Sequence, residues 1–240
     1  MIAGRQRPGG KGGDGKKGDG LKTRVKTARK RSLSSTLWLE RQLNDPYVAQ
    51  AKRDGWRSRA AYKLLEMDER YKLLKPGMKV VDLGAAPGGW SQIAARKTGA
   101  ANGNAKARVV AIDLLPVDPI PGVEFAQMDF LDDDAPEALR AILGGPADAV
   151  MSDMAANATG HRQTDHLKIV ALAELAAEFA REILAPKGFF LAKVLQGGSE
   201  TQLLAQLKRD FATVRHVKPA ASRKDSAELY VLATGFRGGQ

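Results

Sequence analysis

The chain has 240 residues, 43% of them hydrophobic, which is enough for one α/β domain of about 200 residues and a tail. It has no cysteine. This excludes a disulfide scaffold and a thiolate metal site, and it suits a reducing, cytoplasmic location. No apolar run approaches the ~18–20 residues of a membrane span, and the N-terminus lacks the apolar stretch of a secretory signal.

The formal net charge is +11, and it is concentrated at the N-terminus. Residues 1–32 hold eleven Lys and Arg against two Asp, a net charge of +9 that leaves +2 for the rest. Residues 1–20 also contain eight glycines. We therefore predict a disordered basic tail at 1–34 and a single domain at 35–240. The tail is either an arm that neutralises RNA phosphates or a solvated leader.

Along the body, apolar runs alternate with segments of helical spacing. Helices are expected at 58–74, 165–184 and 200–211, with Pro186 and Gly188 marking the end of the second. Strands are expected at 79–83, 108–112, 123–127, 147–151, 189–194, 213–217 and 229–233.

This alternation predicts an α/β fold, in which a mostly parallel seven-stranded sheet has helices on both faces. The last two strands are separated by about a dozen residues, including Pro219, which leaves little room for a crossover helix. They should therefore be antiparallel to each other, giving one reversed strand near the C-terminus.

A glycine-rich turn follows the first strand, in the segment Val80-Val81-Asp82-Leu83-Gly84-Ala85-Ala86-Pro87-Gly88-Gly89-Trp90-Ser91. Glycine lets a backbone approach a ligand closely, and doubly wound folds bind ligands at such strand ends. Ala86 breaks the G-x-G-x-x-G pattern of dinucleotide sites, and the Gly-Lys-Ser/Thr ending of a phosphate loop is missing. Both phosphate-binding readings are therefore weak.

Two acids close the next two strands. Asp113 is placed to accept hydrogen bonds from a ribose diol, and Asp129 could accept one from an adenine amino group. A ribose, an adenine and no phosphate loop together suggest S-adenosylmethionine. The alternative is that both acids are ordinary turn residues.

From about Trp38 to Gly235, the sequence resembles the FtsJ/RrmJ family. The resemblance rests on five segments: Arg57-Ser58-Arg59-Ala60-Ala61-Tyr62-Lys63-Leu64, Asp82 to Gln92, Asp113-Leu114-Leu115-Pro116, Met151-Ser152-Asp153-Met154-Ala155 and Lys193-Val194-Leu195-Gln196-Gly197. It departs from the usual family pattern at Ala156, where Pro is common, and at Leu195, where Phe is common.

The resemblance implies a Rossmann-like methyltransferase that uses S-adenosylmethionine to methylate ribose 2′-oxygens of RNA. Bacterial members similar to this chain act on a uridine of 23S ribosomal RNA in the large subunit. The family's catalytic Lys-Asp-Lys-Glu set falls on Lys63, Asp153, Lys193 and Glu228. Its cofactor positions fall on Gly88, Trp90, Asp113, Asp129 and Asp153.

The predicted topology can gather these charges. Asp153 and Lys193 lie near the ends of parallel strands, and Glu228 opens the reversed strand beside them. Lys193 interrupts an apolar strand, which is costly unless the lysine is paired or functional. Our hypothesis is that Lys193 acts as general base. Lys63 and a sulfonium would favour its neutral form, whereas Asp153 and Glu228 would oppose it. Lys193 could instead only orient the hydroxyl.

The remaining polar residues leave alternatives open. Arg57, Arg59, Arg223 and Lys224 either line an RNA path or are ordinary surface charges. The three histidines show no metal-ligand spacing, so no metal is expected. We predict a monomeric cytoplasmic protein that contacts RNA and no membrane. Rival functions are a dehydrogenase, a non-enzymatic RNA-binding or ribosome-assembly protein, and the same chemistry on transfer RNA or a cap.

Overall fold

The structure is a computed structural model that describes residues 27, 33–155, 160–197, 201–223 and 225–238. The chain divides into two compact units, Met1–Asp45 and Pro46–Gln240. In the first unit, helix α1 spans Leu33–Leu43, across the predicted boundary between residues 34 and 35. The tail predicted at 1–34 lies almost wholly outside the described residues.

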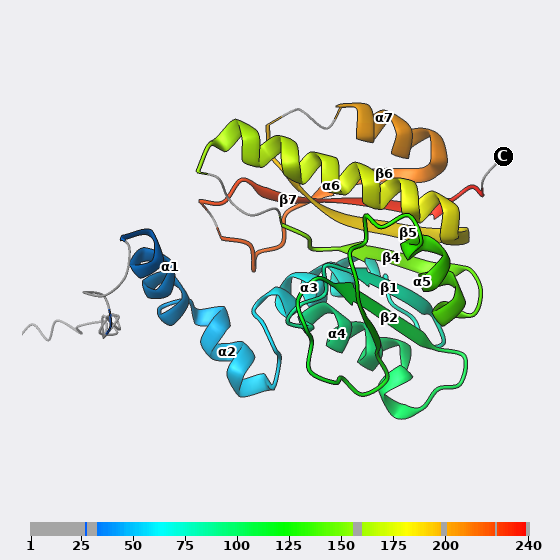
Figure 1. Ribbon diagram of the computed structural model, residues 1–240, viewed down its shortest axis with the longest axis horizontal. Coiled ribbons are helices and arrows are strands. Elements are labelled where there is room, and N and C mark those ends of the chain that lie inside the picture. Colours follow the sequence, from blue (N-terminus) through cyan, green and yellow to red (C-terminus); the bar gives the residue numbers. More distant parts are fainter. Residues whose placement is uncertain (1–26, 28–32, 156–159, 198–200, 224, 239–240) are drawn as a thin grey trace, which may run out of the picture. The chain divides into compact units, whose positions relative to one another are not determined.

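The second unit is a three-layer α/β fold (Figure 1). Its helices are α2 (Pro46–Asp54), α3 (Ala60–Tyr71), α4 (Gly89–Thr98), α5 (Ala135–Leu143), α6 (Arg162–Ile183) and α7 (Thr201–Asp210), with a short 3₁₀ turn at Ala100–Asn102. Its strands are β1 (Lys79–Leu83), β2 (Arg108–Asp113), β3 (Glu124–Gln127), β4 (Ala147–Ser152), β5 (Leu184–Leu195), β6 (Phe211–Val217) and β7 (Glu228–Phe236).

The seven strands form one sheet in the order β3-β2-β1-β4-β5-β7-β6. The pairs among β1 to β5 are parallel, whereas β7 is antiparallel to both β5 and β6. The predicted seven-stranded sheet with one reversed strand is thus confirmed. The reversed strand lies inside the sheet, between β5 and β6, so that Leu195 pairs with Glu228 and Lys193 with Tyr230.

Two hydrophobic cores cover the two faces of the sheet, as expected when β1, β2 and β4 are almost wholly buried. On one face, strand residues pack against Leu139 of α5, Ala176 of α6 and Leu203 of α7. On the other face they pack against Leu64 of α3 and Ile93 of α4. The helices therefore lie on both sides of the sheet, as predicted.

Strand β5 begins earlier than expected, at Leu184 instead of residue 189. Helix α6 ends at Ile183, and the pairing with β4 shifts register between Ala147 and Ala149, so Pro186 and Gly188 lie within an irregular first part of the strand. Lys187 has a φ of 71°, which fits such an irregularity. Pro186 and Gly188 therefore mark the end of the helix without ending the strand that follows it.

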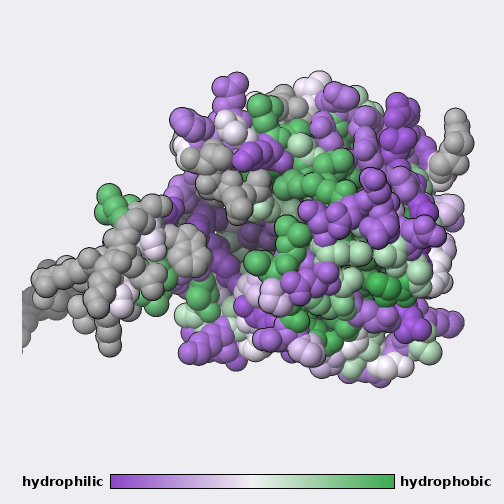
Figure 2. Space-filling model, in the orientation of Figure 1, coloured by the Kyte–Doolittle hydropathy of each residue, from purple (hydrophilic) through white to green (hydrophobic). Residues whose placement is uncertain are grey.

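The surface drawn in Figure 2 mixes polar and apolar side chains, with apolar ones gathered over the layer that carries α6. Leu167 and Leu175 of this helix are exposed. None of the helices in the described ranges combines the length and apolar character that a membrane crossing requires.

Candidate active site

The glycine-rich turn joins β1 to α4 at the carboxyl edge of the sheet. Gly84 has a φ of 74°, and a Cβ there would lie 2.3 Å from Met154 Cγ. The backbone N–H groups of Gly84 and Ala85 both donate to the carbonyl of Ile112, at 2.9 and 3.0 Å. The turn is therefore bonded to the end of β2, and it packs so closely against Met154, after β4, that a side chain at Gly84 would displace this residue.

Asp113 and Asp129 occupy the neighbouring strand ends. Asp113 ends β2, and its two carboxylate oxygens accept hydrogen bonds from Ala86 N and Leu115 N, both at 2.8 Å. Asp129 lies two residues past the end of β3 and accepts from Leu131 N at 2.9 Å. Each carboxylate offers about four lone-pair positions, so both retain acceptor capacity for a ligand.

A cavity of about 380 Å³ lies beyond the ends of β1 to β4. Gly84, Asp113, Asp129 and Asp153 line it, together with apolar side chains such as Met128. A smaller cavity of about 150 Å³ shares Gly84 and Asp153 with it and adds Asp82 and Trp90. An apolar cleft with a few fixed carboxylates suits a nucleoside whose hydroxyl and amino groups donate hydrogen bonds.

The predicted cofactor positions do not all line these cavities. Trp90 lines only the smaller one, and its indole N–H donates to the carbonyl of Ala60 at 2.9 Å. Gly88 is not among the described residues that line either cavity. A Cβ at Gly88 would lie 2.5 Å from Ile120 Cδ1, so this glycine permits the close packing of the loop after β2.

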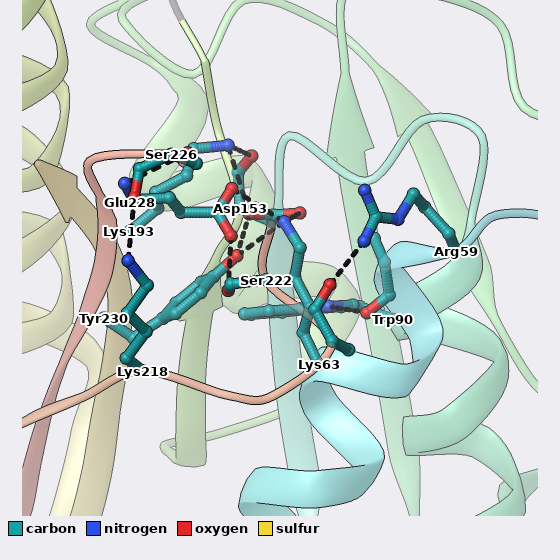
Figure 3. A network of polar contacts seen from close by, with 12 residues as sticks. Arg59, Lys63, Trp90, Asp153, Lys193, Lys218, Ser222, Ser226, Glu228 and Tyr230 are labelled. Atoms are coloured by element: carbon teal, nitrogen blue, oxygen red, sulfur yellow. Dashed lines mark hydrogen bonds and ion pairs between the residues drawn. The ribbon is translucent and has the colours of Figure 1, made fainter. Parts of the chain in front are cut away.

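The structure brings the four predicted charged residues into one cluster (Figure 3). Lys193 Nζ donates to the Asp153 carbonyl at 2.6 Å and to Asp153 Oδ1 at 3.1 Å. Lys63 Nζ lies 2.8 Å from Glu228 Oε2 and 3.8 Å from Asp153 Oδ2. These side chains are only 10–16% exposed, so the charges interact in a partly desolvated environment.

Tyr230 is a member of this cluster that the sequence analysis missed. Its hydroxyl donates to Asp153 Oδ1 at 2.7 Å and accepts from Lys63 Nζ at 3.0 Å. It lies two residues after Glu228 on β7, so the two-residue period of a strand places both on one face. Ser222 completes the cluster by donating to Glu228 Oε1 at 2.8 Å.

The cluster shifts the pKa values of two of its members. Burial alone would raise the pKa of Asp153, but the charges of Lys193 and Lys63 and the hydrogen bonds from Tyr230 and Lys193 hold it below its ordinary value. Burial raises the pKa of Tyr230 well above its ordinary value, and the charges of Asp153 and Glu228 add to this. Near neutral pH, Asp153 is therefore an acceptor and Tyr230 a donor.

Asp82 is a buried carboxyl whose raised pKa was not predicted from the sequence. It is almost fully buried in β1 and accepts a hydrogen bond from Ser91 Oγ at 2.5 Å. Burial raises its pKa to about 7, assisted by the charges of Asp153 and Asp113 and opposed by the Ser91 hydrogen bond.

Two of the arginines considered as RNA contacts are engaged within the fold. The Arg57 guanidinium donates to the carbonyls of Asp118 at 2.6 Å, Pro119 at 2.7 Å and Pro87 at 3.4 Å. Arg59 donates to the carbonyl of Ala221. Lys224 lies outside the described residues.

Comparison with known proteins places the chain in a family. A family described as FtsJ-like methyltransferase matches residues 56–236. The chain is 72% identical over 224 residues to "Ribosomal RNA large subunit methyltransferase E" of Xanthobacter autotrophicus, covering 93% of this chain and 87% of the relative. A protein of the same name from Azorhizobium caulinodans is 71% identical over 218 residues, covering 91% and 90%.

A solved structure supports this assignment. The crystal structure of a protein from Plasmodium falciparum, described as a ribosomal RNA methyltransferase, matches with a TM-score of 0.68 and 30% identity. The match covers 77% of this chain and all of that one. From its sequence, its Rossmann-like fold and these relatives, the chain belongs to the family of FtsJ-like methyltransferases.

Proposed function

We propose that the protein transfers the methyl group of S-adenosylmethionine to the ribose 2′-hydroxyl of a uridine in 23S ribosomal RNA of the large ribosomal subunit. The observation that carries this proposal is the cluster of Lys63, Asp153, Lys193 and Glu228 beside a cavity that also holds Asp113 and Asp129. The relatives' names supply the class of RNA.

The cavity residues fit a nucleoside methyl donor. Asp113 would accept hydrogen bonds from the ribose diol and Asp129 from the adenine amino group, through the lone pairs that their backbone partners leave free. Trp90, Gly88 and Asp153 complete the proposed cofactor set. When bound, S-adenosylmethionine supplies an electrophilic methyl group on a sulfonium.

The charged cluster would prepare the acceptor hydroxyl. Alignment of the reactants can supply about 7–11 kcal/mol of the barrier reduction, and a general base adds roughly 10²–10⁴-fold. In our hypothesis a neutral Lys193 Nζ takes the proton of the 2′-hydroxyl as the oxygen gains the methyl group. Asp153, which holds Lys193 through two contacts, fixes the direction of that nitrogen. Lys63 and Glu228, paired at 2.8 Å, complete the cluster around Asp153.

The test is methyl transfer from labelled S-adenosylmethionine to unmodified large subunits, naked 23S RNA and bulk transfer RNA. We expect label in large-subunit RNA as an alkali-resistant 2′-O-methyl nucleotide, and its loss in Lys193→Ala. Label only in transfer RNA would overturn the substrate. No label despite binding of the methyl donor would favour an assembly factor that binds RNA without modifying it.

Lys193→Arg tests the base hypothesis separately, because arginine keeps the charge but does not deprotonate. We expect a rate at least about 100-fold below wild type, in line with the loss of a general base. A near-normal rate would show that Lys193 only orients the hydroxyl.

We further propose that the protein acts as a monomer in the cytoplasm.

A further inference from the structure

A cavity of about 550 Å³ opens at the other half of the carboxyl edge of the sheet. It is lined by His166 of α6, by Leu195 and Gln196 at the end of β5, by Lys218 after β6, and by residues 225–227 before β7. We call it the Lys218 cavity. It shares no lining residue with the cavity of Asp113 and Asp129, which lies beyond β1 to β4. Its volume is within the range of about 300–1,000 Å³ for ligand sites.

The Lys218 cavity adjoins the charged cluster directly. Leu195, two residues after Lys193, pairs with Glu228 in the sheet, and Gln196 N donates to the carbonyl of Ala227 at 2.7 Å. Glu228 N in turn donates to Ser226 Oγ at 3.2 Å. Figure 3 draws Lys218, Ser226 and Glu228 in the same network of polar contacts. The cavity therefore begins two residues along β5 from Lys193, the residue that a bound ribose would have to reach.

Lys218 gives the cavity the chemistry of a phosphate contact. It is exposed, and its ammonium donates to the Ser226 carbonyl at 2.8 Å, which leaves two of its three N–H donors for a ligand. No carboxylate within the described ranges forms an ion pair with it. Asp225 lines the same cavity and would repel a phosphate, but its carboxylate suits a ribose hydroxyl or a base amino group.

His166 adds a polar atom that lacks a protein partner. Its Nε2 is buried, and no hydrogen bond to it is found among the described residues. Gly197 packs against the imidazole, because a Cβ there would lie 2.9 Å from His166 Cε1. A buried nitrogen without a partner is unfavourable, and a hydrogen bond from a ligand would offset that cost. Gln196, which the charged cluster does not use, thus lines this cavity, and Gly197 packs behind it on His166.

We propose that the Lys218 cavity binds the RNA nucleotide that flanks the methylated ribose. Lys218 contacts its phosphate, and His166 and Gln196 contact its base or sugar. The proposal rests on the proposed function and adds the binding site for the neighbouring nucleotide. It predicts that loss of Lys218 and loss of Gln196 weaken RNA binding in two different ways. Phosphate contacts are sensitive to salt, whereas contacts to a base or sugar are much less so.

The experiment measures methyl transfer to unmodified large subunits across a series of salt concentrations. For Lys218→Ala we expect a higher KM for the subunit and a plot of log(1/KM) against log[salt] that is shallower by roughly one unit, the loss of one phosphate contact. Lys218→Arg should restore the slope, since it keeps the charge. For Gln196→Ala we expect roughly a tenfold higher KM with the slope unchanged. In all three variants the Kd for S-adenosylmethionine should stay at the wild-type value.

Lys208→Ala is the matched control, because Lys208 is an exposed lysine at the end of α7, just before β6 begins at the opposite edge of the sheet. It should leave both KM and slope unchanged. A wild-type slope and KM in Lys218→Ala would overturn the proposal, as would an equal loss in the Lys208 control. If the wild-type protein labels no large-subunit RNA, the proposed function is wrong, and this inference, which rests on it, is wrong as well. Thermal unfolding of each variant identifies losses that come from misfolding.

Discussion

Asp82 shows how one buried carboxyl can couple folding to pH. Its pKa in the folded protein, about 7, is far above its ordinary 3.8, so the folded chain binds this proton more tightly than the unfolded chain does. The stabilisation from Asp82 is complete below about pH 4 and is lost as the pH rises through 7.

We therefore predict that Asp82→Asn, which stays neutral, removes this loss. Between pH 5 and pH 8 the wild-type free energy of unfolding should fall relative to that of the variant by about 2–3 kcal/mol. Urea unfolding of both proteins at the two pH values provides the measurement. Parallel pH profiles would mean that Asp82 is ionised in the folded protein throughout.

Tyr230→Phe removes a hydroxyl from the charged cluster while keeping the ring that packs on Trp90, with centroids 5.6 Å apart. In this variant Asp153 loses its hydrogen bond from Tyr230. We therefore expect the pKa of Asp153 to rise and the interaction between Asp153 and Lys193 to weaken. Because hydrogen bonds to charged groups contribute about 1.5–3 kcal/mol, kcat should fall roughly ten- to a hundredfold with little change in donor Kd. Tyr71→Phe is a matched control at the end of α3; an equal loss there would show a general effect of losing a tyrosine hydroxyl.

Between elements, the Arg57 guanidinium joins the glycine-rich turn to the loop that follows β2. That loop begins with Leu114 and Leu115, which line the cavity of Asp113 and Asp129, and continues to the carbonyls of Asp118 and Pro119 that Arg57 binds. The arginine therefore links Pro87 of the glycine-rich turn to the loop whose first residues line the cavity of Asp113 and Asp129.

Arg57→Ala should raise the Kd for S-adenosylmethionine by roughly tenfold, because the loss of these hydrogen bonds, about 1 kcal/mol each, leaves the loop free to move. Titration calorimetry of the variant and of Arg53→Ala, an exposed arginine at the end of α2, would measure this. If Arg57 instead contacts RNA phosphates, the variant will keep its donor affinity and lose part of the salt dependence of its subunit KM.

The sequence predicted the seven strands well because short apolar runs such as that in Lys79–Leu83 are bounded by turn residues like Gly77 and Gly84. It also predicted that Asp153, Lys193 and Glu228 would meet, since they lie just after β4, near the end of β5 and at the start of β7, all at one edge of the sheet. It did not predict that β7 lies between β5 and β6, because strand order depends on pairing between distant segments. The sequence did not predict the partners of Arg57 for the same reason, because Asp118 and Pro119 lie 61 and 62 residues further along the chain.

At the scale of the whole chain, the basic tail and the body divide the charge unequally, with +9 in residues 1–32 and +2 in the rest. We propose that the tail contacts RNA phosphates. A variant without residues 1–32 should then have a several-fold higher KM for large subunits at physiological salt and a shallower salt dependence, while its Kd for S-adenosylmethionine is unchanged.

The control for the tail is a chain of full length in which the eleven tail lysines and arginines are replaced by glutamine. It should behave like the truncated protein if charge is what matters. Unchanged KM and slope in both variants would show that the tail is only a solvated leader.

Strand β7 comes last among the strands along the chain, yet it lies inside the sheet and carries Glu228 and Tyr230. During synthesis, β1 to β6 therefore emerge from the ribosome before the strand that must slide between β5 and β6. Until it arrives, the inner edge of β5 is unpaired and prone to bind other strands, and the charged cluster lacks two of its members. A chain interrupted before residue 228 would thus be both inactive and prone to aggregate, so methyl transfer can begin only once synthesis has passed this strand.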